Sequence, residues 1–375
     1  MRAGDATLLS AWNLRSERSG SYLEVRMFPA DAPVVDHLAA RRIRDVSEVL
    51  THTRCMVDQP LREAVRLLPD PLRHFAGYHI GWWDENGSTV VNDGGKTIRP
   101  ALVLLSCEAA GGDPADAVPA AVAVELLHNF SLLHDDVMDG DLTRRHRPTV
   151  WSLFGTSNAI LAGDAILGLA PRILSATGSE HALTAIDWFG KCVVKLCEGQ
   201  AADISFSERV DVGIDACVAM ARAKTGELLG TSCALGGLFA GADRTQITAL
   251  REFGSEIGLA FQLVDDLLGI WGDPAVTGKP VRSDLVDRKK SLPVTAALGS
   301  GTQAGRRLAE LFHQEESDAG LLAELVEEAG GRDWAMQTAE QAFARAKQWL
   351  EQAGLDKVAG GELLALAALT CRRNK

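Results

Sequence analysis

The sequence predicts an all-α protein built as one helical domain. Two observations support this fold class. From about Val46 to the C-terminus, apolar residues recur with a helical period, Ala and Leu are abundant, and alternating β-branched runs are few. Short segments rich in Pro, Gly and Asp, such as "NDGGKTIRP" and "EEAGGRD", separate the periodic stretches. Hydrophobic residues make up 46% of the 375 residues, which is enough for a large core.

The chain divides into two unequal parts. Residues 1–45 lack periodicity and are predicted to form a poorly ordered tail, whereas residues 46–375 form the helical domain. No apolar run reaches the roughly 20 residues of a membrane span, and no signal peptide is recognisable at the N-terminus. The seven Cys form no CxxC pair, which is typical of reduced thiols in a cytoplasmic protein. A net charge of −12 argues against a nucleic-acid partner.

The segment "AVAVELLHNFSLLHDDVMDG" (residues 121–140) is predicted to be a helix with acidic residues on one face. Leu126, Phe130, Leu133 and Val137 form an apolar stripe, and His128, Ser131, Asp135 and Asp139 form a second stripe. Two carboxylates one turn apart repel each other, and desolvation among Leu and Val adds to the cost. A divalent cation removes both penalties, and Mg²⁺ usually takes one or two carboxylates together with substrate phosphates. Arg144 and Arg145 follow this helix, and together these features favour a metal site over a solvated helix end.

A second helix, "IGLAFQLVDDLLGIWGDP", repeats this arrangement. Gln262, Asp265 and Gly269 share one face, Asp266 follows Asp265, and the helix is predicted to end near Gly272. Lys279 and Lys289 lie beyond it. Two buried acidic pairs with nearby cations are hard to explain by packing. We therefore expect two walls of one cavity that share a metal cluster, with cations that bind phosphate groups.

Three further segments carry polar residues that are weak signals on their own. "DGGKTIRP" places Gly95, Lys96 and Arg99 at a helix start, where backbone N–H groups favour anions. "RAKTGELLG" places Lys224 and Thr225 in an apolar helix, and "CEGQAADISF" places Gln200 and Asp203 three residues apart.

Taken together, these motifs resemble those of the trans-isoprenyl diphosphate synthase (polyprenyl synthetase) family. Five of them occur in the family's order between about Pro60 and Pro293: "GGKTIRP", "LLHDDVMDGDLTRR", "GQAAD", "KTGEL" and "FQLVDDLLGIWGDPAVTGKP…DLVDRKKSLP". The resemblance implies an all-α bundle around a deep central cavity and a homodimer. It also implies three Mg²⁺ per active site and condensation of isopentenyl diphosphate with allylic diphosphates.

The resemblance also implies roles for individual residues. The metal ligands would be Asp135, Asp139 and Asp265, and Asp136 and Asp266 would orient them. Isopentenyl diphosphate would contact Gly95, Lys96, Arg99, His128 and Arg145. The allylic diphosphate would contact Arg144, Lys224, Lys279 and Lys289. Thr225 and Gln262 would line the reacting centre beside Lys224, and Gln200 and Asp203 would support it.

Two positions depart from the family pattern. The second motif ends in Gly269 where the family has a third Asp, so one carboxylate is missing, and Asp273 is a candidate to compensate. His146 stands where the family has a glycine after the Arg pair. The first change puts the affinity of the third Mg²⁺ in question.

In this family, the residues five and four positions before the first aspartate set product length. Here they are Phe130 and Ser131. One aromatic and one small residue resemble synthases that stop at C20, which favours geranylgeranyl diphosphate. Farnesyl diphosphate and longer products stay open, since Phe130 also lies on the apolar stripe. A class I terpene cyclase is an alternative, but it would not need Lys96, Arg99 and Arg145. A non-catalytic partner subunit is another, and only Gly269 points to it.

Overall fold

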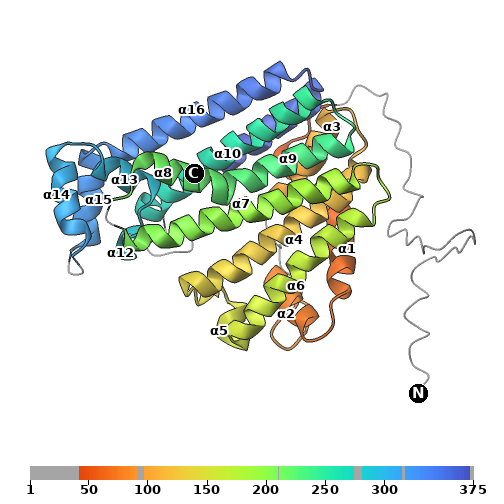
Figure 1. Ribbon diagram of the computed structural model, residues 1–375, viewed down its shortest axis with the longest axis horizontal. Helices are drawn as coiled ribbons and strands as arrows, with labels where there is room; N and C mark the ends of the chain where they lie inside the picture. Colours follow the sequence, from red (N-terminus) through yellow and green to blue (C-terminus); the bar gives the residue numbers. More distant parts are fainter. Residues whose placement is uncertain (1–41, 91–96, 210, 274–280, 315–316, 372–375) are drawn as a thin grey trace, which may run out of the picture.

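Helices make up most of the computed structural model, which describes residues 42–371 apart from 91–96, 210, 274–280 and 315–316 (Figure 1). The predicted all-α class is therefore confirmed. The first half contains α1 (Val46–Arg66), α2 (Leu72–Ile80), α3 (Ile98–Ala109), α4 (Pro114–Asp139), β1 (Thr143–Arg144), β2 (Arg147–Pro148), α5 (Val150–Phe154), α6 (Thr156–Ser175) and α7 (Ala182–Glu208).

The second half continues the bundle and adds a small helical group near the C-terminal end of α10. It contains α8 (Ile214–Ala221), the π-helical segment η1 (Arg222–Gly226), α9 (Glu227–Phe239), α10 (Arg244–Trp271), α12 (Ser283–Val286), α13 (Leu292–Leu298), α14 (Gln303–Phe312), α15 (Ala319–Glu328), α16 (Gly331–Gln352) and α17 (Lys357–Cys371).

Helix α4 forms the centre of the bundle. It packs against α3, α6 and α9, while α10 packs against α9 and α16. Helix α4 is long and apolar enough to cross a membrane, but 78% of its apolar window is buried inside the protein. Its composition is therefore that of a core helix.

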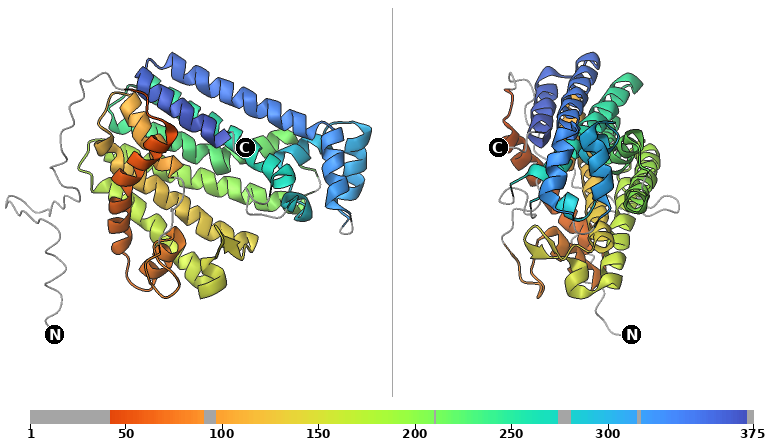
Figure 2. Two further views of the ribbon diagram at one scale, coloured as in Figure 1. Left: turned by 180° about the vertical axis from the view of Figure 1, so that it is seen from behind. Right: turned by 90° about the vertical axis from the view of Figure 1, so that its left-hand side faces the viewer.

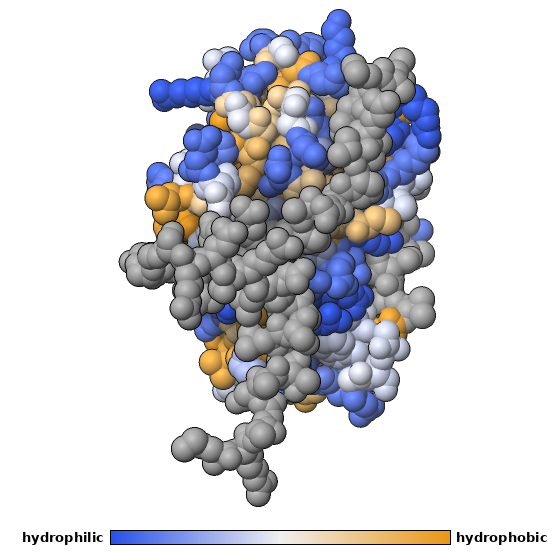
Figure 3. Space-filling model, turned by 90° about the vertical axis from the view of Figure 1, so that its right-hand side faces the viewer, coloured by the Kyte–Doolittle hydropathy of each residue, from blue (hydrophilic) through white to orange (hydrophobic). Residues whose placement is uncertain are grey.

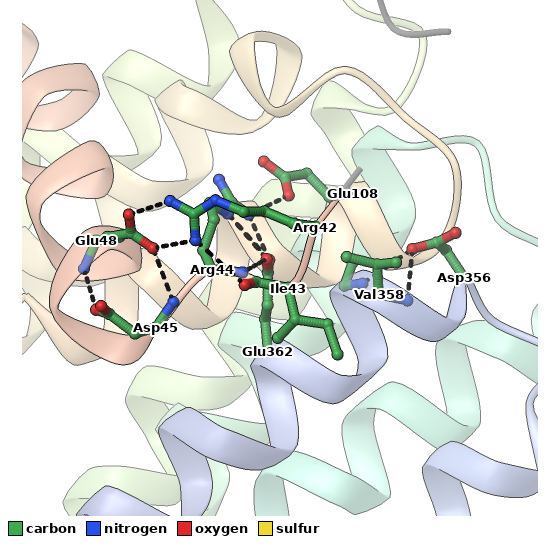
Figure 4. Close-up of polar contacts among 10 residues, drawn as sticks. Arg42, Ile43, Arg44, Asp45, Glu48, Glu108, Asp356, Val358 and Glu362 are labelled. Carbon is green, nitrogen blue, oxygen red and sulfur yellow. Dashed lines mark hydrogen bonds and ion pairs between the residues drawn. The ribbon is translucent and has the colours of Figure 1, made fainter. Parts of the chain in front are cut away.

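The first described residues are fixed to the back of the bundle, where α17 packs against α3 and α1 (Figure 2). Asp45 caps α1, because its side chain accepts a hydrogen bond from Glu48 N at 2.9 Å. The Arg44 guanidinium reaches Glu108 on α3 at 2.6 Å and Glu362 on α17 at 2.5 Å (Figure 4). Residues 1–41 of the predicted tail lie outside the described residues.

The C-terminal ends of α4, α7 and α10 point to the same end of the bundle, on the left in Figure 1. The opposite end, in Figure 3, carries hydrophilic and apolar side chains side by side. Glycines let η1 approach both of its neighbours. A Cβ on Gly258 of α10 would lie 2.4 Å from the Cα of Gly226. A Cβ on Gly199 of α7 would lie 2.5 Å from the backbone nitrogen of Lys224. The polar residues of these three elements are thereby brought together.

Candidate active site

The first acidic motif lies in the last two turns of α4, as predicted. Asp135 is half-buried and Asp139, one turn later, is exposed. Burial raises the pKa of Asp135 to about 6, an effect that Lys224 opposes and Asp139 reinforces. Burial also raises the pKa of Asp139. The pair is therefore costly to ionise without a cation beside it.

The second acidic motif lies near the C-terminal end of α10, which ends at Trp271 with Gly272 as its cap. The Asp265 side chain is exposed, whereas Asp266 is only 4% exposed. Asp266 accepts hydrogen bonds from Gln262 Nε2 at 2.8 Å and from the Leu292 nitrogen at 2.9 Å, and burial raises its pKa to about 6. Asp266 thus orients Gln262 directly.

Lys224 and Thr225 lie in η1, where the sequence predicted an ordinary helix. The π-helical turn presents Lys224 Nζ to Asp203 Oδ2 on α7 at 2.6 Å. Thr225 Oγ1 donates to Gln262 Oε1 on α10 at 2.7 Å. Single π-helical turns inside α-helices are frequent at functional sites. Here the turn joins both acidic motifs, since Lys224 also acts electrostatically on Asp135.

Gln200 and Phe130 are both buried. Gln200 is 6% exposed, and neither polar atom of its side chain has a hydrogen-bond partner among the described residues. Phe130 is 7% exposed and its ring centroid lies 4.6 Å from that of His134. Ser131 donates to the His128 carbonyl at 2.8 Å.

The Arg pair lies on a two-residue hairpin between β1 and β2. Thr143 pairs with Pro148 and Arg144 with Arg147, so Arg145 and His146 form the turn with φ of 52° and 62°. Positive φ at both positions is typical of a type I′ turn, which usually contains glycine. His146 adopts this conformation, which glycine would adopt without strain.

The two arginines of the pair have different surroundings. Arg144 Nε donates to the buried Asp136 Oδ1 at 2.5 Å. Asp136 therefore orients an arginine, a role that the sequence did not indicate. The other oxygen of Asp136 is buried without a hydrogen-bond partner among the described residues. Arg145 acts electrostatically on Glu125 of α4 and on His128, as does Arg99 at the start of α3.

A small pocket that is open to solvent lies against this hairpin. Its lining includes Arg144, Arg145, Arg147, Asp136 and His79. Burial, and then the three arginines, lower the pKa of His79 to about 3, so the imidazole is neutral at physiological pH. Such a pocket favours an anion.

Three residues at this site were not predicted from the sequence: His79, Arg147 and Glu125. His79 and Arg147 are brought together only by the tertiary fold, and Glu125 is one buried acid in a long apolar run. Only Glu125 could have been found from the sequence, because a charged residue inside an apolar helix stands out.

Lys289 acts electrostatically on both acidic motifs, because it lowers the pKa of Asp139 on α4 and also acts on Asp265 and Asp266 of α10. Burial opposes its charge, but Asp266, Asp284, Asp203 and Asp265 raise the pKa of Lys289 above its ordinary value. Three of the predicted ligand-binding residues, Gly95, Lys96 and Lys279, lie outside the described residues.

The donor set fits Mg²⁺ bound together with a phosphate ligand. Among the residues that the structure describes, no three His, Cys, Asp or Glu side chains converge as a metal site on their own. Hard carboxylate oxygens are nevertheless present on both walls, and Mg²⁺ commonly completes its shell with substrate phosphates and water. Asp135, Asp139 and Asp265 offer carboxylate oxygens that could hold such an ion.

An all-α bundle with two acidic helix ends, lysines and an arginine hairpin at one end is the architecture of an isoprenoid synthase. The model of the polyprenyl synthetase family matches residues 81–329, and the chain belongs to this family. It is an isoprenyl diphosphate synthase, a trans-prenyltransferase of isoprenoid biosynthesis.

Two curated relatives from Mycobacterium tuberculosis have different products. The chain is 47% identical to a (2E,6E)-farnesyl diphosphate synthase over 334 residues, and 46% identical to a geranylgeranyl diphosphate synthase over 330 residues. Each match covers 87% of this chain and 93% of the relative.

Solved structures agree with the fold. A polyprenyl synthetase from Streptomyces coelicolor is 43% identical with a TM-score of 0.82, covering 87% of this chain and 99% of that one. A geranylgeranyl pyrophosphate synthase from Corynebacterium glutamicum, complexed with isoprenyl diphosphate and magnesium, is 26% identical with a TM-score of 0.75. That match covers 88% of this chain and 100% of the other.

Proposed function

We propose that the enzyme uses Mg²⁺ to condense isopentenyl diphosphate with allylic diphosphates, and that its main product is geranylgeranyl diphosphate. The observation that carries the reaction is the convergence of Asp135, Asp139, Lys224 and the α10 acids at one end of the bundle. The magnesium-bound relative from C. glutamicum supports the cofactor.

The residue types suit ionisation of an allylic diphosphate. Mg²⁺, when bound, neutralises the diphosphate leaving group as the C–O bond breaks. Lys224, Lys289 and Arg144 add positive charge around it, fixed in place by Asp203, the α10 acids and Asp136. The π-bond of isopentenyl diphosphate then attacks the allylic cation. The released diphosphate takes the proton, so no protein base is required.

The isopentenyl subsite is proposed at Arg99, His128 and Arg145. Burial lowers the pKa of His128, and Arg99 and Arg145 lower it further. A neutral imidazole there can donate one hydrogen bond to a diphosphate. A terpene cyclase would not need this second anion subsite, which argues against the cyclase alternative.

The C20 product is proposed from Phe130 and Ser131. A buried aromatic ring one turn before Asp135 would limit the growing chain, while the small Ser131 leaves room on the metal face. The farnesyl and geranylgeranyl relatives are almost equally similar, so they favour neither product.

A homodimer is proposed from an exposed apolar surface on α6 and α7, which pack side by side. Leu161 on α6 is 53% exposed, and Leu183 and Val194 on α7 are 82% and 68% exposed. Such a surface is typical of a subunit interface. Val194→Asp should convert the dimer into a monomer in light scattering after size exclusion.

A product assay tests the reaction. Purified protein, Mg²⁺ and labelled isopentenyl diphosphate are incubated with dimethylallyl, geranyl or farnesyl diphosphate, and chain length is read by chromatography after dephosphorylation. A C20 alcohol from all three starters is expected. A C15 product would assign farnesyl synthesis. No condensation with any starter would refute the proposed reaction, and in that case diphosphate release from a longer prenyl diphosphate would indicate a cyclase.

A further inference from the structure

Gly269 is the position at which the second acidic motif lacks its last carboxylate, one turn after Asp265. A Cβ built on Gly269 would lie 2.4 Å from Oδ2 and 2.7 Å from Oδ1 of Asp284. Both distances are far below van der Waals contact. The Asp284 carboxylate of α12 therefore fills the volume into which a side chain at 269 would project.

The fold fixes Asp284 at this place. Leu285 next to it is fully buried and belongs to the same apolar cluster as Ile270, the neighbour of Gly269. The Asp284 carbonyl accepts a hydrogen bond from the backbone nitrogen of Lys289 at 2.8 Å. The buried Leu285–Ile270 packing thus sets the register of α12 on α10.

The charged groups around Asp284 belong to the proposed metal site. Asp284 and Asp266 both act on Lys289, together with Asp203 and Asp265. Four carboxylates act electrostatically on this one lysine, and Lys224 is already paired with Asp203. The wall therefore keeps an excess of negative charge that favours divalent cations.

We propose that Asp284 supplies, from α12, the acidic group that the second motif lacks at position 269, and so serves the Mg²⁺ site on the α10 wall. This inference rests on the proposed metal-dependent function. It replaces Asp273, which the sequence suggested for this role: Asp273 follows the end of α10 and is exposed, whereas Asp284 lies directly over Gly269.

Metal binding in the presence of inorganic pyrophosphate tests the proposal without turnover. Mn²⁺ is titrated into the full-length protein with pyrophosphate, and bound Mn²⁺ is counted by electron paramagnetic resonance. Asp284→Asn, which keeps the shape and removes the charge, should weaken Mn²⁺ binding by roughly 10- to 100-fold, the range seen for residues that support metal ligands. The control is Asp287→Asn, an exposed acid on the same segment, which should bind as the wild type.

A second measurement moves the carboxylate from position 284 to position 269. Gly269→Asp alone should bind Mn²⁺ more weakly, because the new side chain collides with Asp284. The double variant Gly269→Asp/Asp284→Ala should bind more tightly than Asp284→Ala alone. Unchanged Mn²⁺ affinity in Asp284→Asn would overturn the inference, whether or not the melting temperature falls.

The proposed function and the role of Asp284 can be refuted separately. A wild-type protein that neither binds Mn²⁺ with pyrophosphate nor condenses substrates would refute the proposed function itself. A wild-type protein that does both, with Asp284→Asn binding Mn²⁺ equally well, would refute only the role of Asp284.

Discussion

Thr225 and Gln262 are joined by a hydrogen bond of 2.7 Å that fixes the orientation of the Gln262 amide. Because the hydroxyl donates to Oε1, the amide nitrogen must point the other way, and it donates to Asp266 at 2.8 Å. A continuous polar line therefore runs from η1 to the second acidic motif. Charge changes at Asp266 will be felt at Gln262 and Thr225, which line the proposed reacting centre.

Asp135→Asn should separate activity from stability. Turnover should fall by roughly 10²- to 10³-fold, in the range for loss of one group that stabilises transition-state charge. The melting temperature should stay the same or rise, because burial penalises the charged carboxylate that is removed. Circular dichroism melts and the product assay measure the two effects. Full turnover would exclude Asp135 as a metal ligand.

Arg145→Ala and Arg144→Ala should affect different substrates. Arg145 is on the hairpin turn beside His128 and Glu125, so its loss should raise the KM for isopentenyl diphosphate about tenfold or more, equivalent to about 1.4 kcal/mol of binding. Loss of Arg144 should raise the KM for the allylic substrate and leave Asp136 buried without its partner. Steady-state kinetics with each substrate varied in turn provide the comparison. Equal effects on both substrates would contradict two separate subsites.

Phe130→Ala should lengthen the product by at least one C5 unit, since the ring is the proposed limit to chain growth. The substitution also removes a buried aromatic side chain and should cost about 3–5 kcal/mol of stability. Leu250→Ala is the matched control, because Leu250 is fully buried in a separate cluster with residues of α3, α10 and α17. A product unchanged in Phe130→Ala would reduce Phe130 to a core residue.

His79→Gln should make stability less dependent on pH. The folded protein holds His79 neutral to about pH 3, whereas the unfolded chain takes up this proton below about pH 6.5. This contribution to the free energy of unfolding is therefore fully present above pH 6.5. It is lost as the pH falls below 6.5, by up to about 1.4 kcal/mol per pH unit. Urea unfolding between pH 7 and pH 5 should show a shallower slope in the variant. His313→Gln, an exposed histidine after α14, is the control. An identical slope in His79→Gln and wild type would contradict the prediction.

Arg44→Ala should destabilise the fold without touching the active site. It removes the guanidinium that pairs with Glu362 and Glu108, whose side chains are 0% and 6% exposed, and breaking such a buried pair costs about 3–5 kcal/mol. Arg42→Ala is the control, because Arg42 pairs with Glu48 on the surface and its side chain is 72% exposed. Chemical denaturation would measure both. A loss in Arg44→Ala no larger than in Arg42→Ala would show that the pair contributes little.

The helices were predictable because each core face repeats at the helical period. The start of α1 at Val46 follows a capping Asp, and the end of α10 precedes Gly272. The acidic motifs were recognisable because carboxylates stand out in an apolar helix.

Other features were not predictable, because no local pattern carries them. The π-helical turn at Lys224 changes the helix register without altering the apolar content of "RAKTGELLG". Asp284 lies over Gly269 only because Leu285 and Ile270 pack together, fifteen positions apart in each case. His79 and Arg147 lie in one pocket through the docking of α2 on the hairpin region.

The π-helical turn also makes the fold sensitive to the number of residues in this segment. An α-helix rotates by about 100° per residue, so deletion of one residue within Arg222–Gly226 would turn α8 against α9 by about that angle. Cys217 and Ala221 of α8 are fully buried on one side, and Leu228 of α9 on another, so both faces could not stay buried after such a rotation. This segment should therefore reject a single-residue insertion or deletion.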